Sequence, residues 1–195
     1  MGKLFYVIGK SATGKDTIFQ KLLENESLAL KPLVLYTTRP MRAGEEQGVQ
    51  YHFTDEAGLT ELQNAGKVIE LRAYDTVHGV WKYFTADTEA TDLEKYNYAS
   101  VGVLESYRAL RNYYGAERVI PIYIEVEDGE RLQRALTRER GQQEPKYAEL
   151  CRRFLADSED FAEEKIAEAG IEKRFYNRDL KESIEEISAY IKEHK

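Results

Sequence analysis

The chain has little cysteine, no excess of positive charge and no long apolar run. Cys151 is the only cysteine among 195 residues, so no internal disulfide can form and a reducing compartment is the simplest expectation. A formal net charge of −7 argues against a nucleic-acid coat protein or a basic membrane anchor. No stretch of about 18 apolar residues could span a bilayer, and the apolar stretch near the N-terminus is shorter than a signal-peptide core. We therefore expect a cytoplasmic protein that binds neither nucleic acid nor membrane.

The overall composition is typical of a soluble globular protein. Apolar residues make up 42% of the chain and charged residues 32%, both within the usual range. The length suits one α/β domain and is short for two independent ones. No internal repeat, low-complexity tract or Gly/Ser linker divides the chain. We expect a single domain over residues 1–195, and nothing in the sequence indicates its oligomeric state.

Strand-like and helix-like segments alternate along the chain. Apolar or alternating runs predict strands at 3–8, 32–36, 48–53, 67–74, 79–84, 96–103, 119–126 and 175–176. Helical periodicity predicts helices at 16–26, from 55 onward, and at 104–114, 128–140, 147–169 and 179–192. Asp55 is a suitable N-cap, and Gly115 a suitable helix end. This alternation predicts an α/β fold with a mostly parallel core sheet, helices on both faces and a small strand-rich lobe inserted after the second core strand.

A glycine-bounded loop follows the first predicted strand and opens the first predicted helix. Its residues are Gly9, Lys10, Ser11, Ala12, Thr13, Gly14, Lys15, Asp16 and Thr17. In this context the pattern predicts a P-loop, whose backbone N–H groups face phosphate oxygens while Lys15 adds a mobile positive charge. The alternative is an ordinary strand–turn–helix corner with a surface lysine. We expect the loop to bind the phosphates of ATP.

Asp16 stands where a P-loop usually carries Ser or Thr, whose hydroxyl binds Mg²⁺. An acidic residue in the first turn of a helix is favoured by about 0.3–1 kcal/mol through the helix dipole. Beside a polyphosphate, however, like charges about 4 Å apart repel by roughly 1–4 kcal/mol. A carboxylate is tolerable there when a cation lies between the two. The sequence therefore predicts that Asp16 holds Mg²⁺, directly or through water.

Arg39 and Arg42 lie three positions apart in a turn that also contains Pro40. Both guanidinium groups can therefore reach one anion, and Tyr51 can add a hydroxyl donor from a nearby strand. Two arginines and a phenol suit a terminal phosphate monoester, because the planar guanidinium matches its oxygens. The alternative is a solvated basic turn.

Together with the P-loop, the segment at 37–53 (TTRPMRAGEEQGVQYHF) resembles the second motif of the guanylate kinase family. Weaker similarity continues through GKVIE, RLQRALTRER, LCRRF and FYNRDL, in that order along the chain. The resemblance implies a P-loop nucleoside monophosphate kinase that uses ATP and GMP with Mg²⁺. It also implies a core at 1–35, 96–136 and 170–195, a monophosphate-binding lobe at about 36–95 and a helical lid at about 137–150.

The same resemblance implies roles for residues of the monophosphate-binding lobe. Residues expected to hold the phosphate of the acceptor are Arg39, Arg42, Tyr51 and Tyr83. Glu70 is expected to accept hydrogen bonds from guanine N1–H and the 2-amino group. Adenine presents an acceptor at N1, so the same carboxylate repels it. Without the resemblance, Glu70 is an exposed strand glutamate.

Catalytic residues are implied in the P-loop and the lid. Lys15, Arg138 and Arg153 are expected to neutralise charge on the transferring phosphoryl group, with Arg134 assisting. The alternative for lid arginines is a helix face paired with glutamates. That alternative is a serious one for Arg131, Arg140 and Arg152.

The chain departs from the family pattern in three places. Leu35 replaces a serine that contacts guanine, and the segment leading to the end of the lobe is longer than usual and includes His78 and Trp81. Ser100 and Gly102 replace two aspartates at the end of the third core strand. Because the P-loop has gained an aspartate, these losses suggest that the carboxylate orienting Mg²⁺ has moved to the loop.

The sequence therefore predicts an ATP-dependent kinase that converts GMP or dGMP to the diphosphate. One alternative is a nucleoside monophosphate kinase of different base preference, favoured by the altered base pocket. Another is a non-catalytic guanylate kinase-like module that binds a protein ligand. Such modules usually have eroded P-loops, whereas Gly9, Gly14 and Lys15 are all present here.

Overall fold

The computed structural model describes residues 1–76 and 79–195, and its centre is a five-stranded parallel sheet. The strands lie in the order β2-β7-β1-β8-β9, and each neighbouring pair runs parallel. Their bounds are β1 Leu4–Ile8, β2 Leu30–Pro32, β7 Asn97–Gly102, β8 Val119–Glu125 and β9 Arg174–Tyr176. The carboxyl ends of these strands point to one edge, where open α/β sheets bind their ligands.

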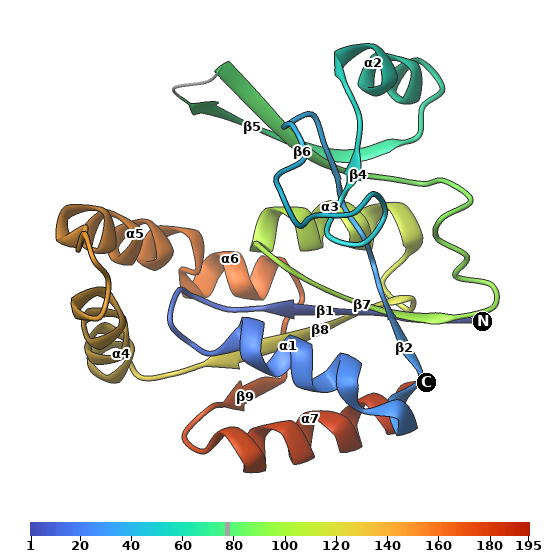
Figure 1. Cartoon of the computed structure of the whole chain (residues 1–195). Helices are drawn as coiled ribbons and strands as arrows, with labels where there is room; N and C mark the ends of the chain where they lie inside the picture. The colour runs from blue at the N-terminus through green and yellow to red at the C-terminus, as the bar shows by residue number, and fades with distance from the viewer. Residues whose placement is uncertain (77–78) are drawn as a thin grey trace.

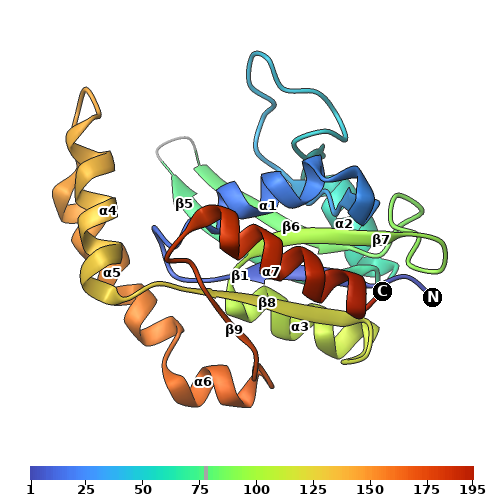
Figure 2. The same ribbon diagram turned by 90° about the horizontal axis from the view of Figure 1, so that it is seen from below.

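Helices cover both faces of this sheet (Figure 1, Figure 2). Leu4, Tyr6 and Ile8 of β1 pack on one face, with buried residues of α3 (Leu104–Tyr114) and α6 (Glu163–Glu168). Phe5 and Val7 pack on the other, with α1 (Lys15–Glu24) and α7 (Leu180–Glu193). Since alternate side chains of a strand point to opposite faces, a strand buried on both faces must be apolar throughout. The prediction of a parallel sheet between two layers of helices is confirmed.

A second sheet lies above the core in Figure 1. Its strands lie in the order β4-β3-β6-β5, with bounds β3 Tyr36–Thr37, β4 His52–Phe53, β5 Val68–Thr76 and β6 Gly79–Ala86. Helix α2 (Glu56–Asn64) packs on it through Leu59, which forms a small cluster with Phe84 and Ala86. The longest pairing is the antiparallel hairpin of β5 and β6, which projects beyond the carboxyl ends of the core strands.

Two further helices stand at the same edge of the core sheet, α4 (Asp128–Arg140) and α5 (Tyr147–Asp160) (Figure 1). They run side by side and form a helical hairpin. A short 3-10 helix, Glu26–Leu28, follows α1. Within the part of the chain that the structure describes, no helix has the length and apolar character needed to cross a membrane.

Three secondary-structure predictions are wrong. Residues 48–53 are not one strand, because residues 48–50 form a turn and only β4, His52–Phe53, joins the second sheet. Residues 32–36 are not one strand, because the chain leaves the core sheet after Pro32 and joins the second sheet at Tyr36. Residues 147–169 are not one helix, because the chain turns after Asp160. The turn brings Phe161 into the core, where its ring stacks on Tyr123 at 6.0 Å. Burial of this ring outweighs the local preference for a continuous helix.

Candidate active site

The predicted P-loop connects β1 to α1 and has the backbone of a phosphate cradle. Gly14 has φ +85° and Ala12 has φ +64°, both in the left-handed region. Helix α1 begins at Lys15, and its N-cap, Gly14, offers no side-chain hydrogen bond. The first amides of the helix therefore lack a side-chain partner and are suited to bind an anion.

Asn177 holds this loop in place from the C-terminal part of the chain. Its buried side-chain amide donates to the Thr13 carbonyl at 2.8 Å. A Cβ added at Gly14 would lie 2.6 Å from the same amide nitrogen. Position 14 therefore requires glycine for space as well as for its φ angle. The sequence did not assign Asn177 this role, because Thr13 lies 164 residues away along the chain.

Lys15 and Asp16 form a loose ion pair at the start of α1. The Lys15 ammonium lies 3.9 Å from the Asp16 carboxylate, and the two side chains are 20% and 81% exposed. Among the described residues, no group of three His, Cys, Asp or Glu side chains could hold a metal on its own. Mg²⁺ commonly binds through one or two carboxylates together with substrate phosphates. A single accessible carboxylate beside the cradle fits Mg²⁺ that arrives with a nucleotide.

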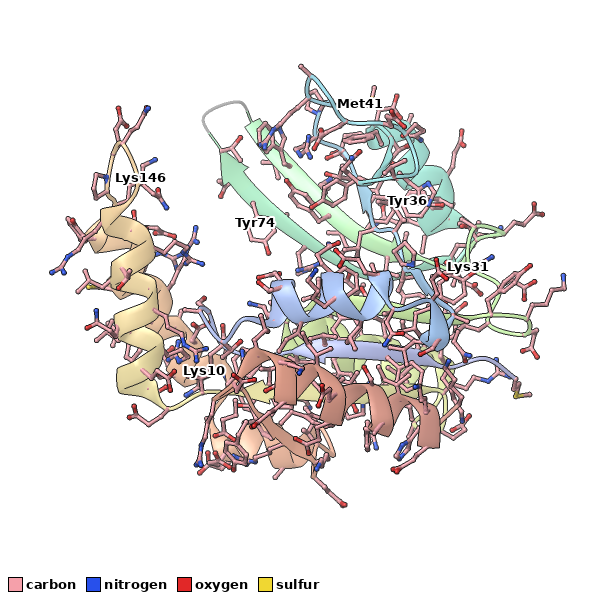
Figure 3. The ribbon with its side chains drawn as sticks, turned by 60° about the horizontal axis from the view of Figure 1, so that its bottom comes forward. Lys10, Lys31, Tyr36, Met41, Tyr74 and Lys146 are labelled. Atoms are coloured by element: carbon pink, nitrogen blue, oxygen red, sulfur yellow. The ribbon has the colours of Figure 1, made fainter. Side chains whose placement is uncertain are left out.

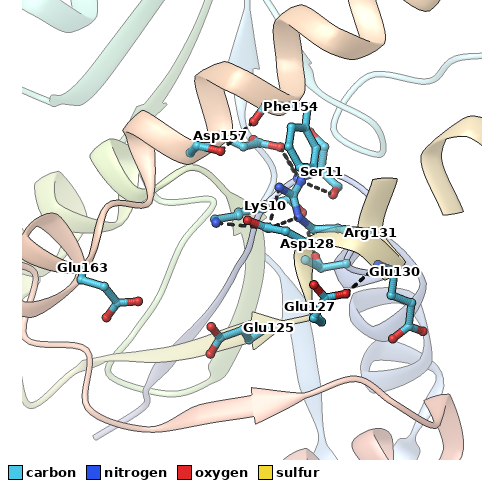
Figure 4. A network of polar contacts seen from close by, with 12 residues as sticks. Lys10, Ser11, Glu125, Glu127, Asp128, Glu130, Arg131, Phe154, Asp157 and Glu163 are labelled. Atoms are coloured by element: carbon cyan, nitrogen blue, oxygen red, sulfur yellow. Dashed lines mark hydrogen bonds and ion pairs between the residues drawn. The ribbon is translucent and has the colours of Figure 1, made fainter. Parts of the chain in front are cut away.

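Arg131 connects the P-loop to both helices of the α4–α5 hairpin (Figure 4). Its side chain is 1% exposed and donates to Asp128 of its own helix at 2.9 Å and 3.1 Å. Nη1 donates to the Ser11 carbonyl at 3.0 Å and to Asp157 of α5 at 3.2 Å. Asp157 also accepts a hydrogen bond from the Ser11 amide at 2.7 Å. Arg131 is therefore a buried structural residue that pairs with two aspartates, not part of the glutamate-paired helix face that the sequence offered as an alternative.

The two arginines expected to be catalytic line one cavity. Arg138 and Arg153 both line a space of about 220 Å³ between α4 and α5, which reaches Ser11 of the P-loop. Arg138 is exposed. Arg153 donates to Glu149 at 2.8 Å, and its side chain is 59% exposed. The fold thus brings these two arginines together beside the loop.

Arg39, Tyr51 and Tyr83 also lie together, in the second sheet. The Arg39 guanidinium carbon is 5.2 Å from the Tyr51 ring centre, and the Tyr51 and Tyr83 rings are 5.6 Å apart. Arg39 is 4% exposed and donates through both terminal nitrogens to Glu45, at 2.7 Å and 2.5 Å. The hydrogen bond from Arg39 lowers the pKa of Glu45 to about 2. Glu45 thereby fixes the direction of the Arg39 side chain.

Arg42 lies at the exposed rim of this cluster. Its backbone N–H donates to Glu45 at 2.7 Å, so the same carboxylate holds the turn that carries both arginines. Its guanidinium carbon is 5.9 Å from the Trp81 ring centre. His78, the other residue singled out in this segment, lies outside the described residues.

Glu70, on β5, is almost buried, with a side chain that is 7% exposed. Oε1 accepts a hydrogen bond from the Thr85 hydroxyl at 2.8 Å. Oε2 accepts from Arg72 Nε and from the Ser106 hydroxyl, both at 3.1 Å. Glu70 is therefore no solvated strand residue. The sequence did not single out Arg72 or Ser106, although an arginine two positions along the same strand is a signal that could have been used.

Ser100 and Gly102, the two positions where the sequence departs from the expected aspartates, lie at the end of β7. A Cβ added at Gly102 would lie 2.2 Å from the Tyr6 hydroxyl, which fills that space. Burial raises the pKa of Tyr6 far above its ordinary value. Ser100 is buried and lines a hollow of about 600 Å³ together with Leu35 and Tyr51.

Comparison with known proteins gives one consistent result. The family model described as guanylate kinase matches residues 1–194. A guanylate kinase of Paraburkholderia xenovorans is 30% identical over 181 residues, which cover 93% of this chain and 77% of that protein. One of Methylobacillus flagellatus is 40% identical over 80 residues, covering 41% of this chain and 38% of that protein. The crystal structure of guanylate kinase from Anaplasma phagocytophilum superimposes with a TM-score of 0.62 at 21% identity, covering 98% of this chain and 85% of that one.

Proposed function

This chain belongs to the guanylate kinase family, and from that premise we propose that it transfers the γ-phosphoryl group of ATP to GMP or dGMP. The observation that carries the proposal is the presence of two separate sets of anion-binding groups. One is the P-loop with Lys15, and the other is the cluster of Arg39, Tyr51 and Tyr83. A kinase that joins two nucleotides needs both a donor and an acceptor site for phosphate.

The donor site is assigned to residues 9–17. Loop amides and the N-terminus of α1 bind the β- and γ-phosphates, and Lys15 neutralises charge that builds up on the γ-phosphoryl group. Asp16 is the residue that would hold Mg²⁺. When bound, the metal offsets the negative charge of the phosphate oxygens. The exposed position of Asp16 at the end of the cradle supports this assignment.

The acceptor site is assigned to the lobe at about 36–95. Arg39, Arg42, Tyr51 and Tyr83 hold the phosphate of the monophosphate, where guanidinium groups match its oxygens. Glu70 accepts hydrogen bonds from guanine N1–H and the 2-amino group. Its burial supports this role, because hydrogen bonds to a charged group are stronger where water is excluded.

The lid is assigned to residues at about 137–150. Arg138 of the lid, Arg153 of the helix that follows it and the assisting Arg134 stabilise the transferring phosphoryl group as the lid closes over it. Closure also excludes water, so that ATP is not hydrolysed without transfer. A cytoplasmic location is part of the same proposal, supported by the single cysteine.

A panel of monophosphates with Mg²⁺-ATP tests the function. We expect GMP and dGMP to give rapid ADP release in a coupled assay, and AMP, CMP and UMP to give little. The inactive control is Lys15→Ala, which removes the ammonium group that lies 3.9 Å from the Asp16 carboxylate. Activity that survives in this control, or an absence of ATP binding by calorimetry, contradicts the proposal. Rapid turnover of another base instead of guanine supports the alternative kinase.

A further inference from the structure

One face of the β5–β6 hairpin carries a row of polar and aromatic side chains. The register places Glu70 opposite Thr85, Arg72 opposite Tyr83, and Tyr74 opposite Trp81. Opposite residues of an antiparallel pair share a face, and so do residues two apart on one strand. Figure 3 shows Tyr74 on the side of the hairpin that faces the core. Arg72 therefore lies on the same face as Glu70 and Tyr83, between the residues assigned to the base and those assigned to the phosphate.

Glu70 has little capacity left for a ligand. An ionised carboxylate has about four lone-pair sites on its two oxygens. Three are taken, one on Oε1 by Thr85 and two on Oε2 by Arg72 and Ser106. Guanine needs one site on each oxygen for N1–H and the 2-amino group. One of the present donors to Oε2 must therefore leave when the base binds.

Arg72 is the donor that can leave. Thr85 and Ser106 are each 1% exposed, whereas the Arg72 side chain is 20% exposed. Arg72 also lines a cleft of about 660 Å³ with Tyr74 and Arg108, so its guanidinium has space to move. The Arg72 backbone stays fixed on β5. After leaving Oε2 of Glu70, its guanidinium therefore remains close to the base that takes its place.

We propose that Arg72 is a specificity-determining residue that donates to guanine O6 while Glu70 binds N1–H and the 2-amino group. The hydrogen-bonding edge of guanine presents, in order, the O6 acceptor and two donors. Arg72 and the two oxygens of Glu70 present the complement, one donor followed by two acceptors. Adenine has an amino group in place of O6, and two donors then face each other. This donor compensates for the serine contact that Leu35 cannot make. The inference rests on the proposed function.

Three nucleotide substrates test whether Arg72 recognises O6 or acts in another way. GMP has all three groups, 6-thio-GMP replaces O6 with a weakly accepting sulfur, and IMP lacks the 2-amino group. We expect Arg72→Ala to lower kcat/KM for GMP by about 10–100-fold, the usual size of a lost charged hydrogen bond. The loss for 6-thio-GMP should be several-fold smaller, and the GMP to IMP ratio should stay near its wild-type value. Arg72→Lys should recover part of the loss, since it keeps a cationic donor.

The control is Arg108→Ala, which removes an exposed arginine from the same cleft. This variant should keep the wild-type kcat/KM for GMP, 6-thio-GMP and IMP. An equal loss for GMP, 6-thio-GMP and IMP overturns the inference, because Arg72 then acts on the phosphate or on the fold. A gain in kcat/KM also overturns it, because Arg72 then only competes with the base. If wild-type enzyme phosphorylates no guanine nucleotide, the proposed function itself fails. If the wild-type enzyme is active and Arg72→Ala keeps the wild-type ratios of kcat/KM among the three substrates, only this inference fails.

Discussion

The Arg131 guanidinium and the Asp157 carboxylate meet in the interior of the protein, with 3.2 Å between Nη1 and Oδ2. The same carboxylate oxygen accepts the Ser11 amide of the P-loop. One ion pair thus attaches both helices of the α4–α5 hairpin to the loop that is proposed to bind ATP. Any movement of α5 relative to the core must preserve this attachment or break it.

We expect Asp157→Ala to destabilise the protein by about 1–3 kcal/mol, because it leaves the Ser11 amide and part of the buried Arg131 guanidinium without partners. Arg131 keeps Asp128, which limits the loss. The free energy of unfolding in urea measures the effect. Glu159→Ala, an exposed change on the same helix, is the control, and equal stability of the two variants contradicts the prediction.

A second prediction concerns the pH dependence of stability. The pKa of Glu45 is about 2 in the folded protein against an ordinary value of 4.5. A lowered pKa means that the Arg39–Glu45 pair stabilises the fold above pH 4.5 and that this contribution disappears as pH falls from 4.5 toward 2. Glu45→Gln should therefore be less stable than wild type at pH 7, and the difference should shrink through that window. Urea midpoints measured from pH 7 to pH 2 test this.

Glu46→Gln serves as the matched control, since Glu46 is the exposed neighbour of Glu45. It should follow the wild-type curve at every pH. If the difference in stability between Glu45→Gln and wild type stays constant down to pH 2, protonation of Glu45 does not cause the loss of stability in acid.

The proposed metal role of Asp16 predicts a selective change in nucleotide binding. Asp16→Ala should weaken binding of Mg²⁺-ATP by about 10–100-fold. The affinity of Asp16→Ala for metal-free ATP should stay the same or increase, because the variant lacks a negative charge near the phosphates. Calorimetric titrations with and without Mg²⁺ measure both affinities, with Glu24→Ala on the exposed side of the same helix as control. Equal losses for the two forms of ATP exclude the metal role.

The lid arginines should affect turnover more than binding. Arg138→Ala and Arg153→Ala are each expected to lower kcat by about 10²–10³-fold, the usual effect of removing one donor that stabilises a transition state. KM for ATP should change little. Arg152→Ala is the control, because Arg152 is exposed and pairs with the same Glu149 as Arg153. Losses no larger than that of the control contradict the catalytic assignment.

The parts of the fold that could be predicted depend on local signals. Asp55 and Asp179 cap their helices through side-chain hydrogen bonds, and Gly115 ends α3 with a positive φ. Each is specified by residues within one turn of the chain. The break at Phe161 depends instead on a core site built by β8, which no local pattern reveals.

The candidate site shows the same division. Arg39 and Tyr51 could be predicted because both lie in one short motif, and the fold places them together. Arg131 could not be recognised as buried, because its partners Ser11 and Asp157 are 120 and 26 residues away along the chain. The donors to Glu70 come from β5, β6 and α3, so only the assembled fold identifies them.

The contact between Tyr6 and Gly102 restricts which variants of this enzyme can arise. Any side chain at position 102 would meet the Tyr6 hydroxyl, which lies 2.2 Å from the position of an added Cβ. An aspartate at 102 thus requires that Tyr6 first become smaller, and a smaller residue at position 6 alone leaves a buried void. The two sites are therefore epistatic. A scan of single substitutions should find that neither Tyr6 nor Gly102 tolerates replacement, whereas a matched pair of substitutions should be tolerated.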